Sequence, residues 1–404
     1  MPVSTGRRSR IPTALVLATV AAVAMTGCAS GSVAQQDVTT APGSGSSASA
    51  SASDSASTQF ASIIPSGDIV AASKQLVDEN LTQKTGFTPP STGPKAQKPG
   101  ATIAYVGSDL TNGGVSGVEQ GVEQAAKVMG WKVNSYDGKA TVSGRTDALN
   151  QAIAASPAAI ILGGFDPTEQ AATIAKAKSG GIPVLGWHAG IASGPGNGLF
   201  TNVSTDPLKV SQLAAAYAVA NSDGKAGVAV FTDSQYAIAV EKAKAMQAYV
   251  QACKTCSVLS YQNSPIADAN TRMPGVISGL LQQFGDKLTY LLAINGNYYG
   301  GAQQGLRAAK KDPAGPPYAI AAGDGDSAEF QRIRSVQYQA ATVADPLLLQ
   351  GWQLVDETNR ALAKQPASTF VASPALITKQ NVPSGAVFDP GSGYRDIYRK
   401  IWGK

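Results

Sequence analysis

Polar and aromatic side chains follow many of the buried strands that we predict in this chain. They are Ser108, Asp109, Asn112, Phe165, Asp166, Trp187, His188, Asp233, Gln235, Tyr236, Asn295, Asn297, Tyr298, Asp324 and Asp326. Carboxylates, amides and hydroxyls exchange hydrogen bonds with ligand hydroxyl groups, and aromatic rings offer flat apolar faces. Since open α/β sheets bind ligands outside the carboxyl ends of their strands, these residues predict a cleft for a small polar molecule.

The single histidine of the chain limits the chemistry that this cleft can support. Any Ser-His-Asp triad or multi-histidine metal site would have to include His188. No Gly-x-Ser-x-Gly elbow is present to supply a nucleophile. We therefore predict binding without catalysis, and neither a cofactor nor a metal. A structural role stays open for several candidates: His188 as a hydrogen-bonded imidazole, and Asp109 and Asp166 as helix N-caps.

A glycine-rich loop offers an alternative function. Asn112-Gly113-Gly114-Val115-Ser116-Gly117 lacks one glycine of the dinucleotide fingerprint, although it follows a predicted strand and opens a predicted helix. The second strand is predicted near 131–136 and does not itself end on an acidic residue, Asp137 being the nearest. We interpret these glycines as permitting a tight turn from strand to helix.

The N-terminus has the features of an export signal. Three arginines precede an apolar stretch from Ile11 to Met25, which is shorter than the roughly 20 residues needed to span a bilayer. The following Met25-Thr26-Gly27-Cys28 resembles the bacterial lipobox, in which the cysteine receives a diacylglyceryl group before cleavage. We predict a signal peptide over residues 1–27 and a mature lipoprotein that begins at Cys28. It would be anchored on the outer face of the cell membrane.

The remaining cysteines and the charge define the environment and exclude one class of partner. Cys253 and Cys256 are predicted to form a short-loop disulfide in an oxidising compartment, with a redox or zinc role as the alternative. Removing residues 1–27, which hold three Arg and no acidic residue, lowers the formal charge from +5 to about +2. A nearly neutral mature chain argues against nucleic acid as a partner.

A low-complexity segment separates the anchor from the body. Residues 29–58 are dominated by Ser, Ala, Gly and Thr and hold too little apolar surface to fold. Thirty such residues have a reach of about 30 Å, so we interpret them as a tether. A helix is predicted over about 68–83, with Ile69, Leu76 and Leu81 against the body, before prolines interrupt the chain.

From residue 101 onward, apolar runs alternate with helical periods, and the series occurs twice. Strands are predicted near 101–107, 131–136, 158–163 and 182–187, and again near 226–232, 257–261, 288–294 and 318–323. This pattern predicts an α/β protein with two similar, doubly wound, parallel-sheet lobes. One larger α/β domain is the alternative.

Several local matches in the same order resemble the type 1 periplasmic binding proteins, the ribose- and galactose-binding relatives that serve ABC importers. They are the segments 199–206 and 341–346, Gly323-Asp324-Gly325 and Asn295-Gly296-Asn297. The resemblance covers about 101–380. It implies a hinge of three strands near Thr205, Ala344 and Ala372, and it adds Asp345 to the candidate site.

The resemblance also implies domain boundaries. The expected order is a tether over 28–66, a helix and Pro-rich lead-in over 67–100, and then two lobes. The first lobe would comprise 101–205 and 346–372, and the second 206–345 and 373–404.

The chain departs from typical pentose and hexose binders of this family. Gly113 and Gly114 stand where those proteins place two aromatics, Val240 where they use an arginine, and His188-Ala189 where Asp-Arg is usual. We therefore expect a monomeric solute-binding lipoprotein of an ABC importer that captures a sugar or polyol and presents it to a permease. The alternatives are a ligand-presenting sensory protein of the same fold and an extracytoplasmic enzyme.

Overall fold

The computed structural model describes residues 59–81 and 89–404, and all of them belong to one compact unit, Ala48–Lys404. The predicted signal peptide, Cys28 and residues 29–58 of the tether lie outside the described residues. No helix of the described ranges is long and apolar enough to cross a bilayer.

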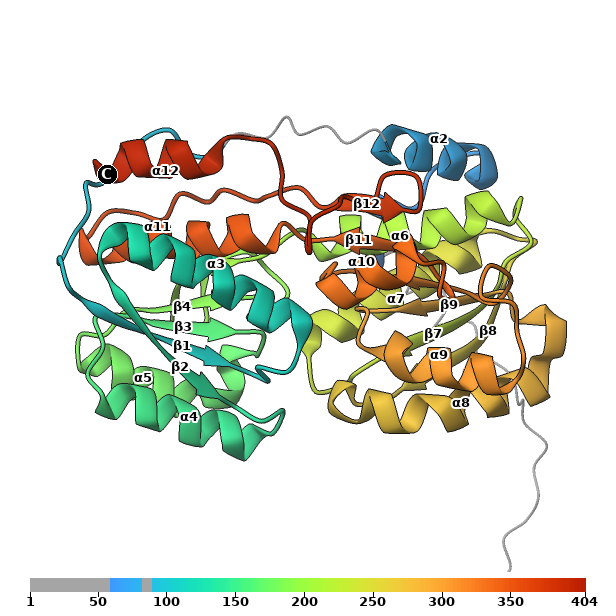
Figure 1. Cartoon of the computed structure of the whole chain (residues 1–404), viewed down its shortest axis with the longest axis horizontal. Coiled ribbons are helices and arrows are strands. Elements are labelled where there is room, and N and C mark those ends of the chain that lie inside the picture. Colours follow the sequence, from blue (N-terminus) through green and yellow to red (C-terminus); the bar gives the residue numbers. More distant parts are fainter. Residues whose placement is uncertain (1–58, 82–88) are drawn as a thin grey trace, which may run out of the picture. The chain divides into compact units, whose positions relative to one another are not determined.

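Two six-stranded sheets organise these residues (Figure 1). The first has the order β2-β1-β3-β4-β6-β5. Its strands are β1 (Thr102–Gly107), β2 (Lys132–Asp137), β3 (Ile160–Gly163), β4 (Val184–Trp187), β5 (Gly194–Gly196) and β6 (Leu199–Val203). We call this sheet and the helices packed on it lobe 1. All its pairs are parallel except β5 with β6.

The second sheet has the order β12-β11-β10-β9-β7-β8, and only β11 and β12 pair antiparallel. Its strands are β7 (Gly227–Thr232), β8 (Ser257–Asn263), β9 (Tyr290–Ala293), β10 (Tyr318–Ala321), β11 (Gln339–Ala344) and β12 (Ala375–Thr378). We call it, with its helices, lobe 2. All eight strands of the predicted double series are present, which confirms two similar lobes rather than one large domain.

The helices cover both faces of each sheet. In lobe 1 they are α3 (Gly113–Met129), α4 (Val142–Ala154), α5 (Ala171–Ser179), α11 (Leu347–Leu362) and α12 (Tyr394–Trp402). In lobe 2 they are α2 (Ile69–Leu81), α6 (Pro207–Asn221), α7 (Ala237–Ala252), α8 (Ala269–Phe284), α9 (Tyr298–Ala308) and α10 (Ser327–Arg334). Short 3₁₀ turns are η1 (Ala61–Ile63), η2 (Pro167–Gln170), η3 (Ile266–Asp268) and η4 (Gly285–Lys287).

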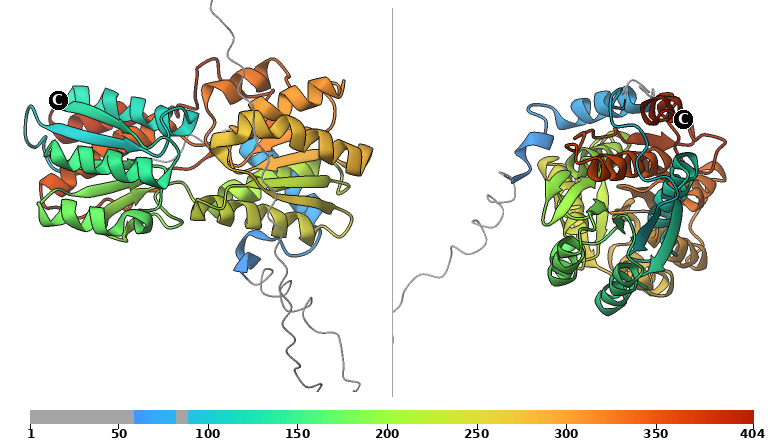
Figure 2. Two further views of the ribbon diagram at one scale, coloured as in Figure 1. Left: turned by 90° about the horizontal axis from the view of Figure 1, so that it is seen from below. Right: turned by 90° about the vertical axis from the view of Figure 1, so that its left-hand side faces the viewer.

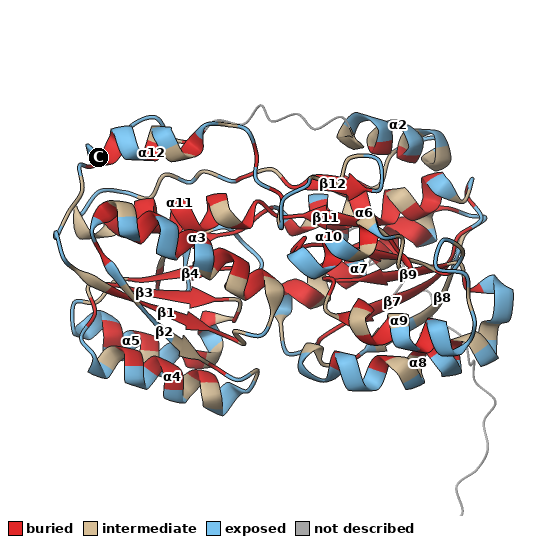
Figure 3. Cartoon of the chain, viewed as in Figure 1, coloured by how far each residue is buried: buried red, intermediate tan, exposed pale blue. Residues whose placement is uncertain are grey.

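The central strands are buried on both faces, and the outer strands β2 and β8 are only partly covered (Figure 3). This explains why the central strands are continuous apolar runs in the sequence. The registers also align the strand ends: Gly107 pairs with Gly163 in lobe 1, and Phe231 with Ala293 in lobe 2. The loops that follow those strands therefore emerge together at one edge of each sheet.

The chain crosses between the lobes at the three predicted places, after β6, after β11 and between α11 and β12 (Figures 1 and 2). A further crossing follows β12, because α12 packs on the α11 side of lobe 1. Tyr398 and Trp402 lie in the same apolar cluster as Trp352 of α11. The expectation that 373–404 belongs to lobe 2 is therefore wrong for α12. The position of α12 is decided by contacts between its apolar face and residues that are distant in the sequence.

The expected tether also ends earlier than residue 66. Phe60 and Ile63 are buried against Ala245 and Ala248 of α7, so these apolar residues dock on lobe 2. The predicted helix begins at Ile69, and its Ile69, Leu76 and Leu81 pack against the lobe 2 core as expected. Residue 83, the expected helix end, lies outside the described residues.

Cys253 and Cys256 are neighbours at the end of α7, with their Cα atoms 5.3 Å apart. This separation lies within the range of a disulfide. The pairing in the exported protein stays a prediction.

Candidate ligand-binding cleft

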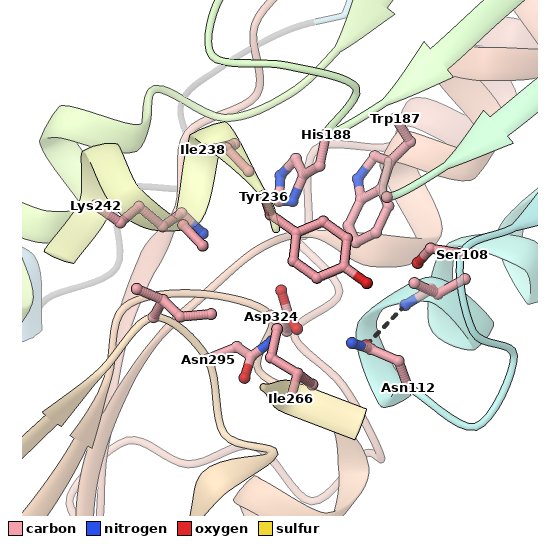
Figure 4. Close-up of a pocket in the computed structure, with 14 residues that line it drawn as sticks. Ser108, Asn112, Trp187, His188, Tyr236, Ile238, Lys242, Ile266, Asn295 and Asp324 are labelled. Atoms are coloured by element: carbon pink, nitrogen blue, oxygen red, sulfur yellow. Dashed lines mark hydrogen bonds between the residues drawn. The ribbon is translucent and has the colours of Figure 1, made fainter. Parts of the chain in front are cut away.

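One cavity lies between the carboxyl ends of the two sheets, and both lobes line it (Figure 4). Lobe 1 contributes Ser108, Asn112, Val115, Gly164, Trp187 and His188, and lobe 2 contributes Tyr236, Ile238, Ala239, Lys242, Ile266, Ile294, Asn295 and Asp324. Its volume is about 60 Å³. Seven of the predicted site residues line it: Ser108, Asn112, Trp187, His188, Tyr236, Asn295 and Asp324.

The lobe 1 side is built on the first residues of α3 and the end of β4. Asn112 caps α3, because its side-chain oxygen accepts hydrogen bonds from the backbone N–H groups of Gly114, at 2.9 Å, and Val115. Ser108 follows β1 directly, and Trp187 ends β4. Each of these residues therefore depends on a rigid element for its position.

His188 presents an imidazole nitrogen without a partner. The residue is 7% exposed, and its Nε2 makes no hydrogen bond within the described structure. The nearest carboxylate oxygen, Oδ2 of Asp345, is 4.0 Å away. Burial lowers the pKa of His188 to about 4, despite the opposing effect of Asp345. His188 is thus neutral at pH 7 and offers one ring nitrogen for a ligand hydrogen bond.

Asp324 is a buried carboxyl group in a tight loop after β10. Gly323, Asp324 and Gly325 all have positive φ angles, 125°, 61° and 71°, which is uncommon for a residue with a side chain. Burial raises the pKa of Asp324 to about 7; Asp345 and Asp326 also raise it, and Lys242 opposes them. The loop therefore places Asp324 at the cavity, where the pKa of its carboxyl group lies close to neutral pH.

Asp345 supports the site from the hinge. It is fully buried, accepts a hydrogen bond from Thr205 Oγ1 at 2.5 Å, and accepts another from the backbone N–H of Asp324 at 3.3 Å. Thr205 and Asp345 stand at two of the crossing segments. Asp345 does not line the cavity, and its geometry links the hinge to the Asp324 loop.

Lys242 is a charged residue that lines the cavity and is not among the residues predicted from the sequence. It lies in the second turn of α7, is 4% exposed and lines the cavity. No carboxylate oxygen of the described residues lies within 4.0 Å of its ammonium nitrogen, the distance that an ion pair requires. The sequence contains one signal that could have identified it. Lys242 follows Ile238 and Ala239 by about one helical turn, which places a charged residue on an otherwise apolar stripe of the helix.

The other predicted residues serve the loops rather than the cavity. Asp109, Asp166 and Asp233 accept hydrogen bonds from nearby backbone N–H groups of Thr111, Thr168 and Gln235. Asp166 thus caps the following turn, η2, as the N-cap alternative anticipated, whereas Asp109 does not cap α3, whose N-cap is Asn112. Gln235 and Asn297 do not line the cavity. The hydroxyl of Tyr298 donates to the carbonyl of Ser264 at 2.8 Å. Asp326 caps α10 by accepting from Glu329 N at 2.8 Å.

Tyr236 makes a contact between the lobes. Its ring lies 5.7 Å from the guanidinium of Arg145, a buried residue of α4 that forms an ion pair with Glu169 at 2.7 Å. Phe165 lies on the same guanidinium, at 5.8 Å, and is fully buried outside the cavity. Tyr236 therefore borders the cavity and also packs on the opposite lobe.

The charges around the cavity disfavour a divalent metal ion. His188, Asp324 and Asp345 have ligand atoms within 4.8 Å of one another. However, Asp345 already accepts from Thr205, and the positive charge of Lys242 acts on both His188 and Asp324. A divalent cation would be repelled by this ammonium group.

Comparison with known proteins identifies relatives of the fold. A family model described as periplasmic binding protein domain matches residues 103–366. No curated protein matches the sequence.

Among solved structures, a sugar ABC transporter protein from Yersinia enterocolitica has a TM-score of 0.64 at 18% identity, with 78% of this chain and 100% of that chain covered. A glucose-galactose binding protein from Geobacillus stearothermophilus has 0.62 at 20%, covering 71% and 100%. A solute-binding protein from Agrobacterium vitis, bound with alpha-D-tagatopyranose, has 0.62 at 19%, covering 71% and 97%. At these identities the similarity shows the fold.

Proposed function

The chain belongs to the periplasmic binding protein family, and from that premise we propose that it captures a small sugar or polyol and delivers it to an ABC permease. The relatives of this family are solute-binding proteins, not enzymes. We further propose that lipid on Cys28 holds the protein at the outer face of the membrane, with residues 29–58 as the tether.

The observation that carries this proposal is the convergence of polar groups from both lobes on one cavity. Ser108, Asn112 and His188 approach from lobe 1, and Lys242, Asn295 and Asp324 from lobe 2 (Figure 4). A ligand that contacts both lobes stabilises the closed form by its preference for that form. Hinge closure of this kind is general among periplasmic binding proteins. Closure would give the permease a signal that ligand is bound.

A binding assay tests the ligand class. Purified protein is titrated calorimetrically with sugars, polyols, nucleosides and amino acids. We expect a sugar or polyol to bind with micromolar affinity, about −8 kcal/mol. Asn295→Ala should weaken that ligand at least tenfold, because it removes a polar group of the cavity. Ser222→Ala, at the C-terminal end of α6 and distant in sequence from every lining residue, serves as the control. Binding of amino acids alone would contradict the proposal.

An uptake assay tests delivery and anchoring. Cys28→Ala should release a protein that still binds ligand but no longer supports uptake of labelled ligand by cells. Persistent uptake by cells expressing this variant would refute the role of the anchor. If cells expressing this variant lose a ligand-dependent transcriptional response but keep their uptake, the sensory alternative is favoured.

A further inference from the structure

Tyr236 of lobe 2 packs against the apolar cores of both lobes. It stands directly before α7 and follows β7 by a short loop. Its ring packs against the core of lobe 2 and also against the lobe 1 cluster that includes Val106, Leu149 and Phe165. Separating the lobes would expose this apolar ring to water, so the shared side chain ties the two cores together.

The lobe 1 partner of this ring is a guanidinium group that hydrogen bonds satisfy only in part. Arg145 is fully buried, and its Nε and Nη2 both donate to Oε2 of Glu169, at 3.1 and 2.7 Å. Its Nη1 has no hydrogen-bond partner among the described residues. The guanidinium carbon lies 5.8 Å from the centroid of the Phe165 ring and 5.7 Å from that of Tyr236. Aromatic faces attract a cation most strongly when it is shielded from water, so both rings stabilise this buried charge.

The contact lies on the side of the cleft away from the hinge. Arg145 belongs to α4, which packs on β1 and β2 and lies on the face of the lobe 1 sheet opposite α3 and α11 (Figure 1). Strand β2 is the sheet edge farther from β6, after which the chain crosses. In lobe 2, β7 lies on the far side of the sheet from β11 and β12, which adjoin the other crossings. When lobes rotate about a hinge, the parts farthest from it separate most, so this contact must break as the cleft opens.

We propose that Arg145 and Tyr236 form a latch that holds the two lobes together with or without a ligand. All atoms of the contact belong to the protein, and Arg145 does not line the cavity. The latch therefore acts on the balance between closed and open forms and not on the choice of solute. Opening must break the contact, so the latch slows both the entry and the release of a solute. This inference goes beyond the proposed function, since it assigns a positioning role to a residue outside the cavity.

Single-molecule energy transfer between the lobes of the ligand-free protein tests the latch. Dyes are attached through non-natural amino acids at Lys178 of α5 and Gln283 of α8, two exposed positions, one on each lobe. Arg145→Met removes the guanidinium group, and Tyr236→Leu removes the ring. In each variant we expect the closed form to last about one tenth as long as in the unaltered protein, the effect of losing a partly shielded cation–π contact.

Further variants separate the latch from a general loosening of the fold. Tyr236→Phe keeps the ring and should leave the closed lifetime unchanged. Phe165→Leu alters the other ring on the same guanidinium, inside lobe 1, and should lower the stability of the fold without changing that lifetime. The double variant Arg145→Met/Tyr236→Leu should behave like either single variant, because both changes remove the same contact. Circular dichroism checks that every variant folds.

Three results would overturn the latch. The first is an unchanged closed lifetime in folded Arg145→Met or Tyr236→Leu protein. The second is a shorter lifetime in Phe165→Leu, which would assign the effect to the core of lobe 1. The third is an additive effect in the double variant, because the two residues would then act independently. The measurement uses no ligand, so each of these results would leave the proposed function standing.

Discussion

At the scale of single residues, the cavity combines one buried ammonium group with carboxyl groups whose charge depends on their surroundings. Asp345 is satisfied by Thr205 and by the backbone of Asp324. The pKa of Asp324 lies near neutral pH, because burial disfavours the charged form of its carboxyl group. His188 is kept neutral by the same effect. The protonation state of Asp324 is thus the property of the site most sensitive to pH near neutrality.

Ligand affinity should therefore rise with pH. A hydroxyl that donates to Asp324 prefers the ionised carboxylate, so below the pKa of about 7 binding must release a proton. We expect affinity to fall by up to tenfold for each pH unit below that value and to level off above it. Calorimetric titrations between about pH 5.5 and 8.5 measure this. The Asp324→Asn variant should bind the ligand more weakly, and its affinity should no longer depend on pH. An unchanged pH profile in this variant would assign the pH dependence to another group.

At the scale of elements, the first turn of α3 and the loop after β10 determine how closely the lobes approach. Gly113 and Gly114 have no side chains, and Asp324 and Asp326 occupy the adjacent space. Asn112 caps the same turn, so the helix end cannot move without losing hydrogen bonds. We therefore expect this contact to limit how closely the two lobes can approach.

Adding one methyl group at this contact should hinder closure. Gly114→Ala would place its Cβ 2.6 Å from Asp324 Cγ, so the lobes must separate or the loop must shift. We expect ligand affinity to fall at least tenfold with the fold intact, and small-angle scattering to show a larger radius of gyration with ligand. Gly275→Ala, in α8 with open space around it, is the matched control. Its expected effect is a small gain in stability, about 0.5–1 kcal/mol. Equal affinities in both variants would contradict this limit.

At the scale of the whole described body, segments at both ends of the chain reinforce the lobes. Near the N-terminal end, residues 60–81 pack on lobe 2, and Asn359 of α11 donates to the carbonyl of Pro94 in lobe 1. At the C-terminal end, α12 returns to lobe 1, where Trp402 stacks on Trp352 with ring centroids 5.6 Å apart. These segments lie outside the stretch matched by the family model, 103–366, except for α11.

The C-terminal helix should contribute strongly to stability. Trp402 is 1% exposed, and its Nε1 donates to Asp356 Oδ1 at 2.8 Å. Trp402→Ala should lower the free energy of unfolding by about 3–5 kcal/mol, through lost burial and a cavity. Urea denaturation measures the change. Lys400→Ala, at an exposed position of the same helix, should stay within about 0.5 kcal/mol. A comparable loss in both variants would mean that the helix, rather than the tryptophan, is responsible.

The sequence by itself determined the strand and helix order, the presence of two similar lobes and the edge at which the polar residues gather. These features follow from local apolar periodicity and from the general placement of ligands at strand ends. Seven of the predicted residues do line the cavity for this reason.

Only the tertiary structure decided which of the strand-end residues face the cavity and which serve their own loops. It also placed Lys242 inside, Asp324 against Gly114, and α12 on lobe 1. Thr205 and Asp345 are 140 residues apart and still share a hydrogen bond. Contacts of this kind depend on how separate elements pack, and local sequence patterns carry no information about that packing.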